Sequence, residues 1–146
     1  MTDEKIDVFM KEAIKLAKLA SRHDEIPIGA VIVKDGQIIA KAYNTREKTM
    51  NAVNHAEILA ITKACKALKN WRLIDCDMFV TVEPCLMCYG ALYNARIRRI
   101  YYGAPNKSNG EIEFDNLSNI QNHKLEIVGG VKEEECSKLL SDFFKR

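Results

Sequence analysis

The stretch MFVTVEPCLMCYGALYNARIRRIYYG, residues 78–103, carries the pattern that decides the fold. Residues 78–82 are almost continuously apolar, and such a short run predicts a buried strand. Residues 85–95 predict a helix, and residues 97–103, rich in Ile and Tyr, predict a second strand. A strand, a helix and a strand in succession are typical of an α/β layered domain.

The sequence on either side continues this alternation of helices and strands. An Asp-Gly pair at 35–36, between two apolar runs, favours a tight hairpin turn. The last helix is predicted to turn its apolar residues, including Phe144, inward. Residues 45–53 and 104–123 are polar or poor in pattern and predict loops, the second with one short helix near 114–120. The remaining helices are predicted at 3–22, 55–69 and 133–145, and the remaining strands at 30–33, 38–40 and 125–128.

The bulk composition is that of one globular domain spanning residues 1–146, with 47% hydrophobic and 29% charged residues. A net charge of +2 neither requires nor excludes a nucleic-acid partner. No apolar run resembles a signal peptide or reaches the length of a membrane span, so we expect no membrane partner. Five cysteines without the spacing of a disulfide framework predict a reducing, cytoplasmic location.

Two short fragments carry side chains that bind metals: HAE at residues 55–57 and PCLMC at residues 84–88. Each is expected where a strand or a loop enters a helix. Zinc takes thiolate and imidazole ligands in a tetrahedron, and catalytic sites use three protein ligands and keep one position open. Two cysteines three residues apart at a helix start can point both sulfurs at one metal, and the exposed N–H groups stabilise their thiolates. The sequence therefore predicts a zinc site made of His55, Cys85 and Cys88.

Glu57 lies two residues after His55, near the predicted metal without being forced to bind it. Zinc lowers the pKa of a water in its open position to about 7, which gives a nucleophile at neutral pH. A general acid/base must then move the protons of that water to the substrate. An amidine-type carbon, such as C6 of adenine or C4 of cytosine, accepts the oxygen, and ammonia leaves. The predicted chemistry is hydrolytic deamination, with Glu57 as the catalytic acid/base.

Three other interpretations of the same residues stay open at this point. The Cys-x-x-Cys pair alone also fits a thiol–disulfide centre. A closed structural zinc site would use a fourth ligand, such as His23, His123 or another cysteine. The cysteines could also be core residues beside a surface histidine. The proline before the pair and the His-x-Glu fragment upstream favour the catalytic zinc site.

The two fragments resemble the zinc signature of the cytidine and nucleotide deaminase superfamily. Within that superfamily, the chain is similar to the bacterial tRNA-specific adenosine deaminases. The similarity extends over most of the chain. The segments that carry it are IPIGA at 26–30, Asn44, HAEI at 55–58, WRL at 71–73, VTVEPC at 80–85, RI at 96–97 and LLSDFF at 139–144.

The resemblance implies a three-layer α/β/α fold around a five-stranded mixed sheet, bound Zn²⁺ and a homodimer. It implies hydrolysis of the wobble adenosine of a tRNA anticodon to inosine. Asn44 matches the family residue that hydrogen-bonds the flipped base, and Ile28 and Leu86 match positions that line its pocket. Asn106 falls where the family approaches the nucleic acid, and His123 matches a histidine near the backbone of the substrate.

Plainer interpretations of these residues stand beside the functional ones. Ile28 and Leu86 fit ordinary core positions, Asn44 fits the amide of a turn or a strand end, and His123 fits a surface or helix-end position. The basic residues of the second half of the chain fit either a solvated surface or an RNA patch.

Three segments depart from the tRNA enzymes. AVN at 52–54 stands where they carry Pro-Thr-Ala, Asn106 stands where they carry Asp, and residues 110–114 do not reproduce a Gly-Ser-Leu-type segment. Glu111 and Glu113 add negative charge where a phosphate backbone would pass, which disfavours tight RNA binding. A deaminase of free nucleobases or nucleosides, acting on cytosine, guanine or a related ring, is therefore a second hypothesis. A non-catalytic zinc module that only binds RNA is a third.

Overall fold

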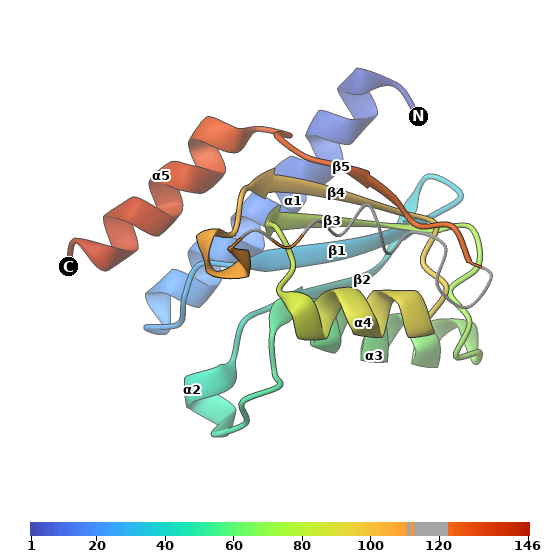
Figure 1. Ribbon diagram of the computed structural model, residues 1–146, viewed down its shortest axis with the longest axis horizontal. Coiled ribbons are helices and arrows are strands. Elements are labelled where there is room, and N and C mark those ends of the chain that lie inside the picture. The colour runs from blue at the N-terminus through green and yellow to red at the C-terminus, as the bar shows by residue number, and fades with distance from the viewer. Residues whose placement is uncertain (111, 113–122) are drawn as a thin grey trace.

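The computed structural model describes residues 1–110, 112 and 123–146 and shows one five-stranded sheet with helices on both faces (Figure 1). The strand order is β2-β1-β3-β4-β5. β1 is antiparallel to β2 and β3, whereas the β3–β4 and β4–β5 pairs are parallel, so the predicted mixed sheet is confirmed. The elements are α1 (Asp3–Arg22), β1 (Gly29–Lys34), β2 (Gln37–Tyr43), α2 (Arg46–Thr49), α3 (Ala56–Leu68), β3 (Cys76–Val82), α4 (Leu86–Asn94), β4 (Arg99–Ala104), the 3-10 helix η1 (Lys107–Asn109), β5 (Glu126–Val128) and α5 (Glu133–Phe144).

The sheet separates two apolar cores, and this gives the three predicted layers. α3 and α4 cover one face of the sheet, and α1 and α5 cover the other (Figure 1). Alternate residues of β1 enter opposite cores: Ile32 packs with α3 and α4, and Val31 packs with α1. β3 is buried along its whole length for the same reason. Strands buried on both faces read as continuous apolar runs, which is why residues 78–82 predicted a strand so clearly.

α1 lies directly on β1 because one glycine permits a close approach. A Cβ at Gly29 would collide with the carbonyl oxygen of Ala13, and Ala17 faces the same point. The alanines of the α1 face are fully buried, as their helical spacing predicted. This contact fixes the start of β1, and with it Ile28, relative to α1.

Two segments differ from the sequence prediction. A one-turn helix, α2, interrupts residues 45–53, which were predicted as a loop, and the reason lies in hydrogen bonds from a distant carboxylate described below. The segment after β4 contains η1, whereas the helix predicted near 114–120 lies outside the described residues. Within the described ranges, none of the helices has the length and hydropathy needed to cross a membrane.

Candidate zinc centre and active site

The three predicted metal ligands meet where α3 and α4 begin, beside the carboxyl end of β3. His55 is the N-cap residue of α3 and Cys85 is the N-cap residue of α4, and both have extended backbones. Neither side chain makes the hydrogen bond that normally caps a helix. Both side chains are therefore free to turn toward a metal.

The ligand geometry fits zinc. The Nδ1 atom of His55 lies 3.7 Å from Sγ of Cys85 and 3.6 Å from Sγ of Cys88, and all three ligand atoms lie within 4.8 Å of one another. Zn–S and Zn–N distances of about 2.3 and 2.0 Å in a tetrahedron require separations close to these. Among residues 1–110, 112 and 123–146, no fourth His, Cys, Asp or Glu joins this group. A closed structural site that uses His23 or His123 is therefore not supported.

Hydrogen bonds among the two thiols and the imidazole shift the pKa values of both cysteines. Hydrogen bonds from Cys88 and His55 lower the pKa of Cys85 to about 4, although burial opposes this shift. The same Cys85–Cys88 hydrogen bond, together with burial, raises the pKa of Cys88. The low pKa favours the thiolate of Cys85 at neutral pH, and Zn²⁺, when bound by these ligands, would take the place of the Cys88 proton. All five cysteines are free thiols, and no disulfide competes with the metal.

Glu57 stands in the first turn of α3 with only 3% of its surface exposed. Its Oε1 atom has no hydrogen-bond partner among the described residues. Burial raises the pKa of this carboxyl to about 7, against the opposing effects of its own backbone N–H and of His55. A buried carboxylate that keeps one oxygen unpaired and titrates near neutral pH is suited to general acid/base catalysis.

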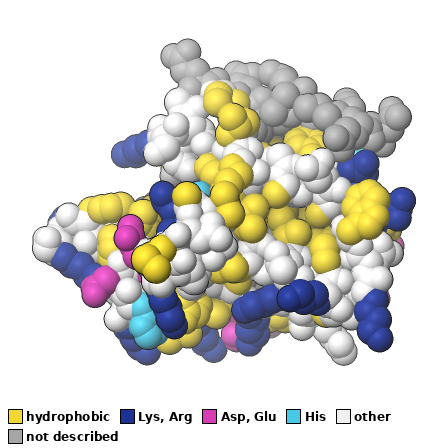
Figure 2. Space-filling view, turned by 90° about the horizontal axis from the view of Figure 1, so that it is seen from below, with side chains coloured by type: hydrophobic (Ala, Val, Ile, Leu, Met, Phe, Trp, Pro, Cys, Tyr) yellow, Lys and Arg dark blue, Asp and Glu magenta, His cyan; other side chains and the backbone are white. Residues whose placement is uncertain are grey.

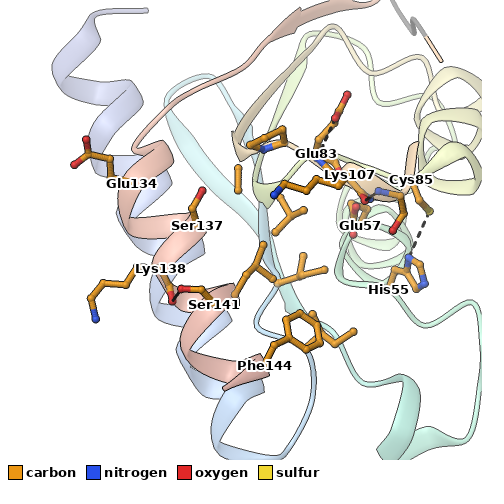
Figure 3. A pocket seen from close by; sticks show the side chains of 18 of the residues that line it. His55, Glu57, Glu83, Cys85, Lys107, Glu134, Ser137, Lys138, Ser141 and Phe144 are labelled. Atoms are coloured by element: carbon orange, nitrogen blue, oxygen red, sulfur yellow. Dashed lines mark hydrogen bonds between the residues drawn. The ribbon is translucent and has the colours of Figure 1, made fainter. Parts of the chain in front are cut away.

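A cavity of about 950 Å³ opens beside the ligands, at the upper end of the range for small-molecule sites. Figure 3 shows His55, Glu57 and Cys85 on one side of it and α5 on the other. Ile28 and the loop that follows β4 complete the wall. His55, Cys85 and Glu57 therefore border a space that a base and its neighbouring groups can enter.

Residues 3–104 match the family model described as the cytidine and deoxycytidylate deaminase zinc-binding region. The matched range contains His55, Glu57, Cys85 and Cys88. The chain belongs to this family. The predicted superfamily, its zinc cofactor and its deaminase chemistry are confirmed.

Several members of this deaminase family are similar to the chain over most of its length. The tRNA-specific adenosine deaminase of Bacillus subtilis (strain 168) is 46% identical over 142 residues, which cover 95% of this chain and 88% of that protein. A structure solved in work on A-to-I editing by tRNA:A34 deaminases at the wobble position of transfer RNA has a TM-score of 0.84 and 41% identity, and covers 90% of this chain and 98% of that one. A guanine deaminase from Bacillus subtilis has a TM-score of 0.67 and 41% identity, and covers 75% of this chain and 68% of that one.

The structure brings two of the five predicted substrate residues to the cavity wall, Ile28 and Asn106. The carboxamide of Asn106 is already engaged: Oδ1 accepts from the backbone N–H of Ser108 at 3.0 Å, and Nδ2 donates to the carbonyl oxygen of Glu83 at 3.3 Å. Asn106 also donates its backbone N–H to the Glu83 carboxylate at 3.1 Å. The geometry therefore supports Asn106 as a residue that holds the wall in place.

The other three predicted residues are not among those that line the cavity. Asn44 is buried next to it, where its Oδ1 accepts from the N–H of Arg46 at 3.3 Å. Leu86 is exposed on the first turn of α4, so it is neither in the core nor on the cavity wall. His123 lies at the opposite end of β4, with Nε2 2.6 Å from the carbonyl oxygen of Ile97. Substrate contacts of Leu86 and His123 stay predictions without support from this geometry.

The part of the cavity that α5 provides was not predicted from the sequence. Phe144, which was predicted to point inward, is 67% exposed, and that prediction was wrong. Phe144 lines the cavity together with Ser137 and Ser141 of the same helix (Figure 3). The spacing of these residues is helical, but the sequence does not say that this face of α5 lies opposite α3. Arg46 and Lys107 also line the cavity. Lys107 is one of the basic residues that fit either a solvated surface or an RNA patch, whereas no role was predicted for Arg46.

Proposed function

We propose that this chain hydrolyses adenosine to inosine at the wobble position of a tRNA anticodon. The observation that carries the proposal is the buried carboxylate of Glu57, with one unpaired oxygen, beside a three-ligand zinc site that faces a cavity. The 46% identity with the tRNA-specific adenosine deaminase of Bacillus subtilis supports this choice of substrate, because the alignment spans nearly the whole chain.

The reaction adds water to C6 of adenine and releases ammonia. Zinc, when bound by His55, Cys85 and Cys88, supplies Lewis-acid activation of the water. The unpaired Oε1 of Glu57 takes one proton from the attacking water and passes it to N1 of the ring as the C6–O bond forms. The same carboxylate delivers the second proton to the exocyclic amine, the C6–N6 bond breaks, and ammonia leaves. A carboxyl with a pKa of about 7 can both accept and return a proton at neutral pH.

The cavity supports a substrate larger than a free base. Arg46 and Lys107 both line it, and Lys107 extends toward α5 in Figure 3. Two cations that flank a base pocket fit the phosphates on either side of a flipped nucleotide. Phe144, exposed at the end of α5, offers a ring face on which a neighbouring base can stack. These groups have no partner in a free base or a nucleoside.

We infer that a second copy of the chain covers the face formed by the loop before α3 and the first turn of α4. Met50, Val53, Leu86 and Met87 expose apolar side chains there, and Figure 2 shows apolar groups spread over this side of the molecule. Large exposed apolar patches mark interaction surfaces, and twofold pairs are the commonest solution. Light scattering is expected to give a dimer for the wild-type chain and a monomer for Leu86→Glu. A monomeric wild type would contradict the inference.

The five free thiols support a cytoplasmic location.

A second candidate function is deamination of a free purine. It is favoured by the 41% identity with the guanine deaminase from Bacillus subtilis, although that match covers only 75% of this chain. The two functions differ in what they require of the cavity mouth. A free-base enzyme needs no cation there, so Lys107→Ala would leave its KM unchanged. A tRNA enzyme would lose affinity, and more so at low salt.

The experiment that tests the proposal compares substrates directly. The zinc-loaded chain is incubated with an anticodon stem-loop that carries A at the wobble position, and separately with adenosine, guanine, cytosine and cytidine. Ammonia release and product mass are measured. Inosine in the stem-loop alone supports the proposal, and turnover of a free base alone establishes the second candidate. Bound zinc without turnover of any substrate would favour a module that only binds RNA.

A further inference from the structure

The short helix α2 is held by a carboxylate that lies far from it in the sequence. Glu25 is buried, with 1% of its surface exposed. Its Oε1 accepts from the backbone N–H of Glu47 at 3.1 Å, and its Oε2 accepts from the backbone N–H of Lys48 at 2.8 Å. Both oxygens of one buried side chain are therefore engaged with consecutive amides of α2.

α2 has no local group that could do this instead. Its N-cap residue, Thr45, makes no side-chain capping bond. The N–H of Arg46 is satisfied by Oδ1 of Asn44 at 3.3 Å, which leaves the next two amides to Glu25. A helix of four residues is too short to be stable without such partners. The side chains of Glu25 and Asn44 thus account for the helix in a segment whose sequence predicts a loop.

Burying the negative charge of the Glu25 carboxylate costs free energy. Glu25 has no salt bridge with any residue in the described part of the chain. A buried carboxylate without a cation is tolerated only when hydrogen bonds replace its hydration, as these two amides do. A glutamine could accept only one of them and would turn an N–H donor toward the other.

The helix that Glu25 holds carries a group of the substrate cavity. Arg46, its first residue, lines the cavity beside His55 and Ile28. The segment that carries Glu25 is anchored in turn, because the Glu25 backbone N–H donates to the carbonyl oxygen of Ala20 at 3.0 Å at the end of α1. A continuous path of contacts therefore runs from the end of α1, through the Glu25 carboxylate, to the guanidinium of Arg46.

We propose that Glu25 is a positioning residue, whose carboxylate fixes α2 so that Arg46 meets a phosphate of the substrate. This role rests on the proposed function, because a free base carries no phosphate for Arg46. Glu25 touches neither the metal ligands nor Glu57 in this arrangement, so it acts on substrate binding and not on the chemical step.

The test uses the zinc-loaded full chain with the Glu25→Gln substitution. Amide hydrogen exchange at Glu47 and Lys48 should accelerate by about tenfold, the equivalent of one lost hydrogen bond. KM for the anticodon stem-loop should rise by about five- to tenfold, with kcat within about twofold of the wild type. Arg46→Ala should raise KM similarly, and adding Glu25→Gln to it should have no further effect, because both changes remove one interaction.

Asp24→Asn is the matched control. It removes the same charge from the neighbouring position, but Asp24 is exposed and pairs with Arg146 instead of α2. Its KM and exchange rates should match those of the wild type. Glu25→Asp keeps a carboxylate on a shorter stem and should give intermediate values, which provides the measurement if Glu25→Gln does not fold.

Unchanged exchange at Glu47 and Lys48 in Glu25→Gln would overturn the proposal, and so would a fall in kcat with an unchanged KM. Additive effects of Glu25→Gln and Arg46→Ala would overturn it as well. If the wild-type chain fails to deaminate the stem-loop, the proposed function fails, whereas the exchange measurement still decides whether Glu25 holds α2.

Discussion

Two buried carboxylates at opposite ends of the sheet show how this molecule separates stability from chemistry. Asp77, near the start of β3, is 1% exposed and accepts two hydrogen bonds from Arg98, both at 2.9 Å. Glu57, beside the carboxyl end of β3, is nearly as buried, yet its Oε1 has no partner within the described residues. The two carboxylates are similarly buried, but both oxygens of Asp77 accept hydrogen bonds, whereas Oε1 of Glu57 accepts none from the described residues. A buried acid that is fully hydrogen-bonded holds the fold, whereas one left unpaired at a cavity is available to substrate.

The largest expected effect comes from removing the acid/base at the unpaired end. Glu57→Gln keeps the shape of the side chain and the zinc ligands but cannot accept a proton. The rate of inosine formation should fall by at least about a hundredfold. Zinc content, measured by atomic absorption, should stay at the wild-type level. Wild-type turnover in this variant would exclude Glu57 as the acid/base.

The second effect is a pH dependence of the metal-free protein. The pKa of Glu57 is about 7 in the fold, above the ordinary value of 4.5, so the folded state binds the proton more tightly than the unfolded state. Stability from this group is therefore fully present below about pH 4.5 and is lost as pH rises toward 7, by about 2 to 3 kcal/mol. Urea unfolding with a chelator at pH 5 and at pH 7.5 should show this loss. The difference between the two pH values should be smaller in Glu57→Gln, and equal differences would contradict the account.

A smaller effect is expected at Asp77, whose two oxygens both accept hydrogen bonds. Asp77→Asn removes the charge and one of the acceptors that Arg98 uses. Arg98 is half-exposed and recovers hydration, so the loss should be about 1 to 2 kcal/mol in the free energy of unfolding. The kcat and KM values should remain within about twofold of the wild type. A loss of activity without a loss of stability would contradict the assignment of Asp77 to stability and of Glu57 to chemistry.

The smallest effect is expected at the surface of that same end. Glu126 accepts from Arg99 at 2.8 Å, and this pair lowers the pKa of the Glu126 carboxyl, but both side chains contact solvent. Exposed ion pairs contribute little to stability. Glu126→Gln should leave the urea midpoint and the activity indistinguishable from the wild type. A midpoint shift as large as that of Asp77→Asn would contradict the ranking by burial.

Short-range patterns in the sequence predicted the features that depend on neighbouring residues. The strand at 78–82 could be predicted because both of its faces are buried. The metal ligands His55, Cys85 and Cys88 could be predicted because the start of a helix sets where their side chains point. Glu57 followed from its spacing to His55.

Features that depend on contacts between distant segments could not be predicted from the sequence. α2 was predicted as a loop because Glu25, which satisfies its amides, lies more than twenty residues earlier in the chain. Phe144 was placed in the core because helical periodicity identifies an apolar face but not the cavity beside it. The local sequence marks Glu57 by its spacing to His55, but it does not show that Asp77 is buried against Arg98. The folded structure adds the partners of each carboxylate: Asp77 accepts from Arg98, whereas Oε1 of Glu57 has no partner among the described residues.

The central claim is tested most directly by one measurement made on two variants. Glu57→Gln and Asp77→Asn are loaded with zinc, and their single-turnover rates of inosine formation in the anticodon stem-loop are compared with that of the wild type. We expect Glu57→Gln to bind zinc and to lose at least about a hundredfold in rate, and Asp77→Asn to keep the wild-type rate. Equal rates in the two variants, or a greater loss in Asp77→Asn, would contradict the account.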